Sequence, residues 1–296
     1  MKICAIMMCK NEDDLISPWT IYHGKLLGFE NLYIFDNGST SAATLEALAR
    51  AECLGVNVRR DKFHPDHYVY KGDIFSELIQ DLDRNSPADF YFPLDCDEFV
   101  CAEIAPYNLC FTSAGLEASL EPYRRFEGAL MIKAAYDNTP KRRSAFLRTS
   151  DQRKTFFAQD ACRMLDHGFH CGEGIDKNAR IHSSVVYLHF HFKPYAQLVF
   201  HARQKIEPFL PGGDLDTFNS GRDGLLKYLE ERRPGFHLIN HLLFADEIDY
   251  LQKFNDEAWV DMPSVEMAFT EVGTSIPFRL SMIGAETNTA DLQGGE

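Results

Sequence analysis

The sequence has no apolar run approaching the roughly 20 residues that a membrane-spanning helix requires. Its first apolar run, residues 3–8, is too short for the core of a signal peptide, and no small-residue cleavage site follows it. We therefore predict a cytoplasmic protein without a transmembrane segment. Peripheral contact with a membrane stays open, as does the oligomeric state.

Basic residues are also scarce, because 30 Lys and Arg stand against 44 Asp and Glu and give a net charge of −14. A chain without a basic surface is not expected to bind nucleic acid. An anionic substrate would need a metal ion or a few placed cations. The eight cysteines include no C-x-x-C pair, so a zinc knuckle is not predicted, and buried thiols are the simplest interpretation.

Strand and helix patterns alternate over the first hundred residues of the 296. This order predicts an α/β fold with a mainly parallel sheet and helices on both faces. The predicted strands are 2–9, 32–35, 56–58 and 90–94, and the predicted helices are 18–27, 41–54 and 72–82.

Polar clusters follow three of these strands. Lys10, Asn11 and Glu12 come after the first, Asp36 and Asn37 end the second, and the run 95–98 (Asp-Cys-Asp-Glu) follows the fourth. Ligands of such sheets bind beyond the carboxyl ends of the strands. We therefore expect the clusters to converge on one site, with the acidic run compensated by a hard divalent cation. The competing interpretation of the run is a solvated acidic turn.

The rest of the chain is less regular. Residues 100–180 favour loops, with a basic stretch at 141–154, and 185–192 predicts a strand that places His189 and His191 on one face. Helices are predicted at 195–206 and within 223–257. His237 and His241 have a spacing that suits zinc, but no third ligand is evident. We expect a catalytic domain at 1–205, a helical C-terminal extension at 206–280 packed on it, and a flexible tail at 281–296.

An ordered set of motifs then resembles a known family. The set comprises Lys10-Asn11-Glu12, Trp19 with Tyr22-His23, Gly28, Phe35-Asp36-Asn37, Asp95-x-Asp97-Glu98-Phe99, and His189-Phe190-His191-Phe192-Lys193 with Tyr195 and Lys205. It is similar to family 2-type glycosyltransferases of the GT-A, Rossmann-like fold, in a bacterial branch akin to the DUF23 or family 92 galactosyltransferase group. Pro194 and Phe190 depart from that group's pattern, which leaves open whether His189 or His191 is the equivalent histidine.

The resemblance implies a metal-dependent transfer from a nucleotide-diphospho-sugar, a UDP-sugar, to a glycan or glycolipid acceptor. Asp97 would bind the metal, Asp95 would lie near the ribose or the metal, and a histidine, His189 or His191, would complete the metal shell. The other implied donor contacts are Asp36 and Asn37 at the nucleoside and Lys10, Asn11 and Glu12 at the base or ribose. Because imidazole suits Mn²⁺ better than Mg²⁺, Mn²⁺ is the preferred ion.

The remaining roles are inferred from the residues themselves. Arg153 and Lys154 of the basic stretch are candidates to neutralise the diphosphate, and a solvated loop is the competing interpretation of this stretch. An inverting transfer needs a carboxylate base, and among Asp160, Asp166, Glu173 and Asp176 we choose Glu173, which lies between two glycines. The alternatives are a nucleotidyltransferase, disfavoured because no glycine occurs in residues 7–12, and a non-catalytic nucleotide- or glycan-binding protein.

Overall fold

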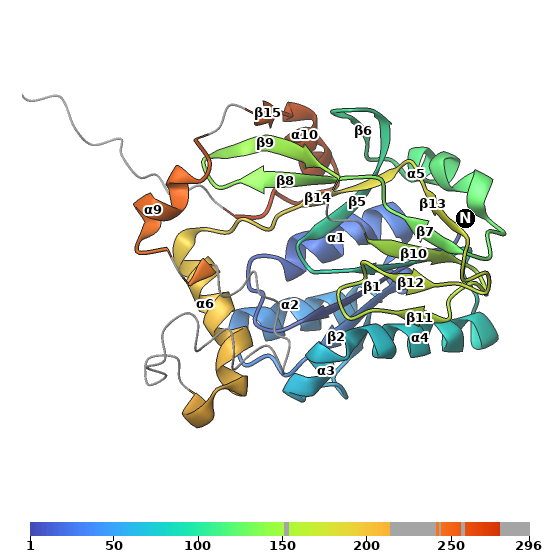
Figure 1. Cartoon of the computed structure of the whole chain (residues 1–296), viewed down its shortest axis with the longest axis horizontal. Coiled ribbons are helices and arrows are strands. Elements are labelled where there is room, and N and C mark those ends of the chain that lie inside the picture. Colours follow the sequence, from blue (N-terminus) through green and yellow to red (C-terminus); the bar gives the residue numbers. More distant parts are fainter. Residues whose placement is uncertain (151–153, 214–240, 243, 256–257, 279–296) are drawn as a thin grey trace, which may run out of the picture.

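A computed structural model describes residues 1–150, 154–213, 241–242, 244–255 and 258–278. The described residues form two large β-sheets, a two-stranded hairpin and the helices around them (Figure 1). The predicted α/β class with a mainly parallel sheet is confirmed. Within the described residues, no helix combines the length and the apolar character that a membrane crossing requires.

The first sheet contains the predicted strands. Its order is β13-β7-β10-β4-β1-β2-β3, in which β1 pairs in parallel with β2 and β4, and β2 pairs in parallel with β3. β10 is antiparallel to both of its neighbours. The bounds are β1 Ile3–Cys9, β2 Leu32–Asp36, β3 Asn57–Arg59, β4 Phe90–Leu94, β7 Ala129–Met131, β10 Thr155–Ala158 and β13 Arg180–His182.

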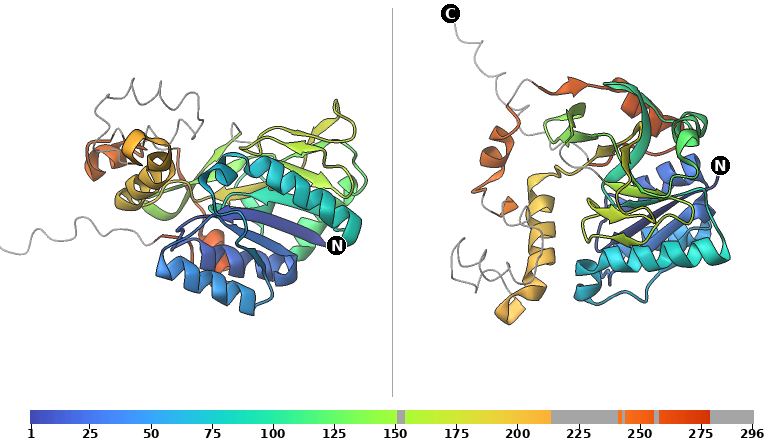
Figure 2. Two further views of the ribbon diagram at one scale, coloured as in Figure 1. Left: turned by 90° about the horizontal axis from the view of Figure 1, so that it is seen from below. Right: turned by 45° about the vertical axis from the view of Figure 1, so that its right-hand side comes forward.

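Helices cover both faces of this sheet because its central strands are apolar on both sides. Along β1, Ala5 packs into the core on the side of α1 (Ile16–Leu27) and α2 (Ala42–Cys53), whereas Ile6 packs into the core on the side of α4 (Lys71–Asn85). Figure 2 shows α4 on one side of the strands and the α1–α2 pair on the other. The strands are thereby held so that their carboxyl ends share one edge.

The second sheet has the order β15-β9-β8-β14-β5-β6 and lies beside the first (Figure 1). β14 pairs in parallel with β8 and antiparallel with β5. Its strands are β5 Glu98–Ala105, β6 Asn108–Cys110, β8 Ala135–Thr139, β9 Arg142–Thr149, β14 Val185–His189 and β15 Val260–Asp261, and a separate hairpin contains β11 Met164–Leu165 and β12 Gly172–Glu173. Much of 100–180, where loops were expected, therefore forms strands, most of them too short to show a clear alternation.

The remaining elements are short or belong to the C-terminal part. α10 packs Phe269 against Tyr22, Phe99 and Phe190, so this part of the chain joins the main core. The predicted helix at 195–206 is confirmed as α6 (Tyr195–Ile206), whereas most of 223–257 and the tail at 281–296 lie outside the described residues. The other elements are η1 Phe29–Asn31, α3 Pro65–Val69, α5 Ser113–Leu120, η2 Glu121–Tyr123, η3 Glu207–Phe209, η4 Pro211–Gly213, α9 Glu247–Gln252 and α10 Pro263–Glu271.

Candidate active site

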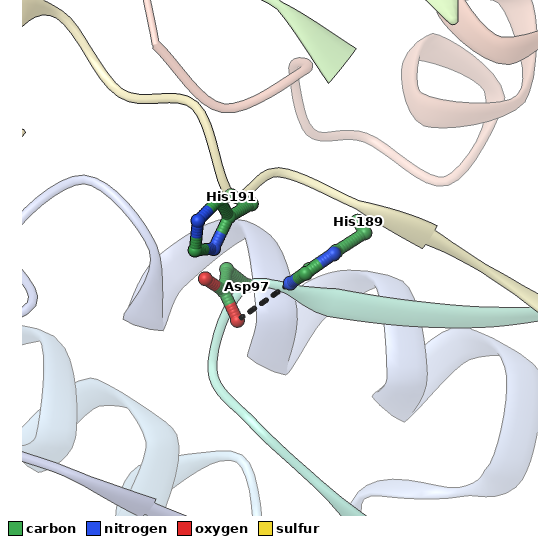
Figure 3. Close-up of side chains that lie close together, drawn as sticks. All are labelled: Asp97, His189 and His191. Carbon is green, nitrogen blue, oxygen red and sulfur yellow. Dashed lines mark ion pairs between the residues drawn. The ribbon is translucent and has the colours of Figure 1, made fainter. Parts of the chain in front are cut away.

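Asp97, His189 and His191 come together at the edge where β4 ends and β5 begins. Their potential ligand atoms, one from each residue, all lie within 4.8 Å of one another. His189 ends β14 and pairs with Glu98 at the start of β5, so the strand register places it beside Asp97. His189 Nε2 lies 3.9 Å from Asp97 Oδ1, and both imidazole rings turn toward the carboxylate (Figure 3). One carboxylate and two imidazoles could together hold a divalent transition-metal ion.

A second carboxylate, that of Asp137, orients His189 through the ring nitrogen that does not face Asp97. β8 pairs with β14 so that Asp137 lies next to His189, and Asp137 Oδ1 lies 2.8 Å from His189 Nδ1. This contact fixes the ring with Nε2 toward Asp97, which is how ligating histidines are commonly held. Burial alone would lower the pKa of His189, but the hydrogen bond that its ring donates to Asp137 and the charge of Asp97 raise that pKa to about 9. Thr149 Oγ1 donates to the other oxygen of Asp137 at 3.0 Å.

Asp95, the first acid of the run, belongs to a different set of contacts. Lys71 Nζ contacts its Oδ1, and Lys154 Nζ lies 2.5 Å from its Oδ2. Burial would raise the pKa of Asp95, but these two lysines hold that pKa well below its usual value. Asp95 is thus bound by cations, and it is not a member of the Asp97 cluster. Of the predicted phosphate-binding cations, Lys154 is placed at this edge, and Arg153 lies outside the described residues.

Glu98 is the most deeply buried acid of the run, at 1% exposed. Its Oε2 accepts a hydrogen bond from the Asp95 backbone N–H at 2.8 Å, and its Oε1 lies 3.4 Å from Lys154 Nζ. Burial raises the pKa of Glu98 to about 7, although the charge of Lys154 acts in the opposite direction. Glu98 therefore stabilises the turn that carries Asp95 and Asp97.

Glu12 ties the loop after β1 to the C-terminal part of the chain. It is 2% exposed, and Lys193 Nζ donates to its Oε2 at 2.6 Å. Lys205 Nζ lies 3.8 Å from Oε1, and His201 Nε2 lies 3.6 Å from Oε2. Burial would raise the pKa of Glu12, but these neighbours, Lys193 foremost, lower it to about 2. The carboxylate predicted to line the nucleoside pocket is engaged by side chains at and beside α6.

The other predicted donor contacts shape the loops at this edge. Asn11 adopts a left-handed conformation with φ 50°, which asparagine tolerates, and its Oδ1 accepts from the backbone N–H groups of Thr40 and Ser41 at 2.7 and 2.9 Å. Asp36 Oδ1 accepts from Ser39 N at 2.8 Å. These contacts join the loops after β1 and β2.

Asn37 and Lys10 complete that edge. Asn37 Nδ2 donates to the carbonyl oxygens of Lys62 and His64, and its backbone N–H donates to Cys9 O. The carbonyl oxygen of Lys10 accepts from Gln204 of α6 at 3.3 Å. The polar segments predicted to converge therefore lie at one edge of the sheet.

Glu173, the predicted base, is not brought to the cluster. It lies on β12, 3.3 Å from Lys177 Nζ. A side chain built on the next residue, Gly174, would meet the backbone of Glu127 and Gly128. Because Gly128 precedes β7, which runs parallel to β4, this is the amino edge of the first sheet, opposite the Asp97 cluster.

The sequence interpretation missed Asp137 and Lys71, which had no motif around them. It named Lys193 and Lys205 as part of a resemblance and gave them no role. Their roles follow from pairings between distant segments. Of the possible zinc pair, His237 lies outside the described residues, and the ring of His241 lies 5.2 Å from that of His191.

Remote structural counterparts exist among solved proteins. S. aureus TarS 1-349 in complex with UDP-GlcNAc gives a TM-score of 0.40 at 12% identity over 94% of this chain and 82% of that one. Glucosyl-3-phosphoglycerate synthase from Mycobacterium tuberculosis, in complex with phosphoglyceric acid, gives 0.33 at 16% identity over 77% and 79%. A cytidylyltransferase from Leptospira borgpetersenii gives 0.28 at 13% identity over 54% and 61%. No family model and no curated protein matches the chain.

Proposed function

We propose that this chain is a metal-dependent glycosyltransferase. It would move a sugar from a nucleotide-diphospho-sugar, a UDP-sugar, to a glycan or glycolipid acceptor with inversion at the anomeric carbon. The observation that carries the proposal is the Asp97, His189 and His191 cluster at the carboxyl edge of a parallel sheet, where ligands of such sheets bind. The family 92 branch and the acceptor remain predictions from the motifs.

The donor set fits a divalent ion such as Mn²⁺. It offers one carboxylate oxygen and two imidazole nitrogens, and the Asp137 contact supports His189 as a ligand. The metal would neutralise charge that develops on the departing diphosphate. Asp97, His189 and His191 would hold the ion. Because Asp95 is engaged by Lys71 and Lys154, we assign it no place among the ligands.

The charges around the cluster suit an anionic ligand. Four lysines face four carboxylates at this edge, namely Lys71, Lys154, Lys193 and Lys205 with Glu12, Asp95, Asp97 and Glu98. Asp137 adds a fifth carboxylate beside His189, so the acids outnumber these lysines, and a divalent ion at Asp97 would supply positive charge that a diphosphate needs. Lys205 is the most exposed of the four lysines, with 26% of its side chain exposed, and it is within electrostatic reach of Asp97. We assign it to the diphosphate.

Calorimetric titration of UDP with and without Mn²⁺ tests this proposal. We expect UDP to bind with Mn²⁺ and to bind at least tenfold more weakly without it. Asp97→Ala should abolish the Mn²⁺ effect, whereas Asp261→Ala, an exposed acid on β15, should leave it unchanged. A screen of UDP-sugars for Mn²⁺-dependent hydrolysis then separates an enzyme from a binding protein. Equal UDP affinity with and without the metal would contradict the proposal.

A further inference from the structure

Two lysine side chains hold one carboxylate between them beside the Asp97 cluster. Lys71 opens α4 and Lys154 directly precedes β10, so their segments come from distant parts of the sequence. Each ammonium group contacts a different oxygen of Asp95. The two ammonium groups are spaced to match the two oxygens of one carboxylate. The same spacing suits binding of a carboxylate or a phosphate.

The two ammonium groups are almost completely buried, but the carboxylate is accessible. The side chains of Lys71 and Lys154 are 8% and 3% exposed, whereas that of Asp95 is 33% exposed. Lys154 also donates to Gly168 O at 3.0 Å and lies near Glu98. Among the described residues, Asp95 is the one carboxylate in contact with Lys71. Of these three side chains, Asp95 is the one that solvent reaches.

Aromatic rings also lie against these ammonium groups. The ring of Phe169 has its centre 4.5 Å from Lys71 Nζ and 4.9 Å from Lys154 Nζ. The ring of Tyr68 lies 5.2 Å from Lys71 Nζ and 5.5 Å from Lys205 Nζ. Contacts with ring faces stabilise the cations without neutralising their charge.

Stability alone gives little reason for this arrangement. Buried ion clusters seldom stabilise a protein more than apolar residues of similar size would. A chain of net charge −14 repels anions in general, so a substrate with an acidic group needs local cations at its binding site.

We propose that Lys71 and Lys154 form a binding site for a second acidic group of the substrate, a phosphate or a carboxylate separate from the diphosphate. The inference rests on the proposed function for its place in the reaction. The acidic group enters on the exposed side of Asp95 and shares the two ammonium groups with it. The substrate class is then a donor with an acidic sugar or an acceptor that carries a phosphate.

Matched charged and neutral ligands test the site by calorimetry in the presence of Mn²⁺. The donor arm compares UDP-glucuronate with UDP-glucose. The acceptor arm compares glycerol 3-phosphate with glycerol on the chain already loaded with UDP. We expect the wild type to prefer the acidic ligand at least tenfold in one arm, and that arm identifies the source of the acidic group.

Variants then assign the preference to the lysine pair. Lys71→Met should reduce this preference, measured as the ratio of the affinities for the acidic and the neutral ligand, to less than threefold. Lys71→Arg keeps the charge and should retain most of the preference. Lys177→Met, a substitution of the same kind at a 72% exposed lysine, should change nothing. An unaltered preference in Lys71→Met would overturn the assignment.

The outcomes separate this inference from the proposed function. If UDP binds with Mn²⁺ but neither arm shows a preference, the acidic-group site is wrong and the transferase proposal stands. If UDP binding does not depend on the metal, the transferase proposal fails. In that case the affinity for inorganic phosphate alone tests the lysine-pair site. Equal affinities of the wild type and Lys71→Met for phosphate would refute this site.

Discussion

Replacing Asp137 by Asn should weaken metal binding although Asp137 is not itself a proposed ligand. Its Oδ1 is 2.8 Å from His189 Nδ1, and both groups are buried. The amide keeps the size of the side chain but removes the charge that fixes the ring. The His189 ring then spends less time in the orientation and tautomer in which Nε2 can bind the metal.

The expected loss is 10- to 100-fold in Mn²⁺ affinity, which is typical when the partner of a ligating histidine is removed. This corresponds to about 1.4–2.7 kcal/mol. A hydrogen bond to a charged group contributes about 1.5–3 kcal/mol, so the two estimates agree. The free energy of unfolding should fall by a similar amount, because Asp137 also accepts from Thr149.

Electron paramagnetic resonance measures free Mn²⁺ directly and gives the dissociation constant with and without UDP. Asp261→Asn makes the same chemical change at an exposed carboxylate and serves as the control. A loss of less than twofold in Asp137→Asn, with the fold intact by circular dichroism, would falsify the orienting role of Asp137.

Three further predictions concern acids elsewhere in the chain. Because the pKa of Glu12 is lowered to about 2, its stabilising effect is present above pH 4.5 and is lost as the pH falls toward 2. Urea unfolding should show about 3 kcal/mol of acid destabilisation that Glu12→Gln lacks, and identical pH profiles would contradict this. Glu103→Gln should cost about 2 kcal/mol in the same assay, because buried Glu103 accepts charge-assisted hydrogen bonds from Arg148 and Tyr136 at 2.6 Å, and a cost below about 0.5 kcal/mol would contradict it. Glu173→Gln should leave transfer within about twofold of wild type, and a hundredfold loss of kcat would support Glu173 as the base.

The sequence predicted β1, β2 and β4 of the first sheet closely because these strands are continuous apolar runs, whereas β7, β10 and β13 were not predicted. The strand predicted at 90–94 matches β4, and the runs at 2–9 and 32–35 match β1 and β2 within a residue. Turn and cap residues such as Gly28 marked helix ends well. The convergence of Asp97 with both candidate histidines was also predictable, although the strand that carries them ends at His189.

The rest of the site depends on pairings that no local pattern encodes. Asp137 reaches His189 because β8 adds to β14 in one register, and a shift by one residue would turn its side chain away. Lys71 lies at a helix start, where a lysine has no local signature of function. The ion pair of Glu12 with Lys193 is likewise not visible in the sequence around either residue.

The Glu12–Lys193 pair has a consequence for synthesis on the ribosome. The two residues are 181 positions apart, so Glu12 leaves the exit tunnel long before its partner is made. At about 5–20 residues per second this interval is on the order of 10–40 s. Until then the loop after β1 has no cation from the C-terminal part to neutralise Glu12, and the carboxylate stays in water. The edge that binds the proposed donor is therefore completed late in translation, after the strands that support it.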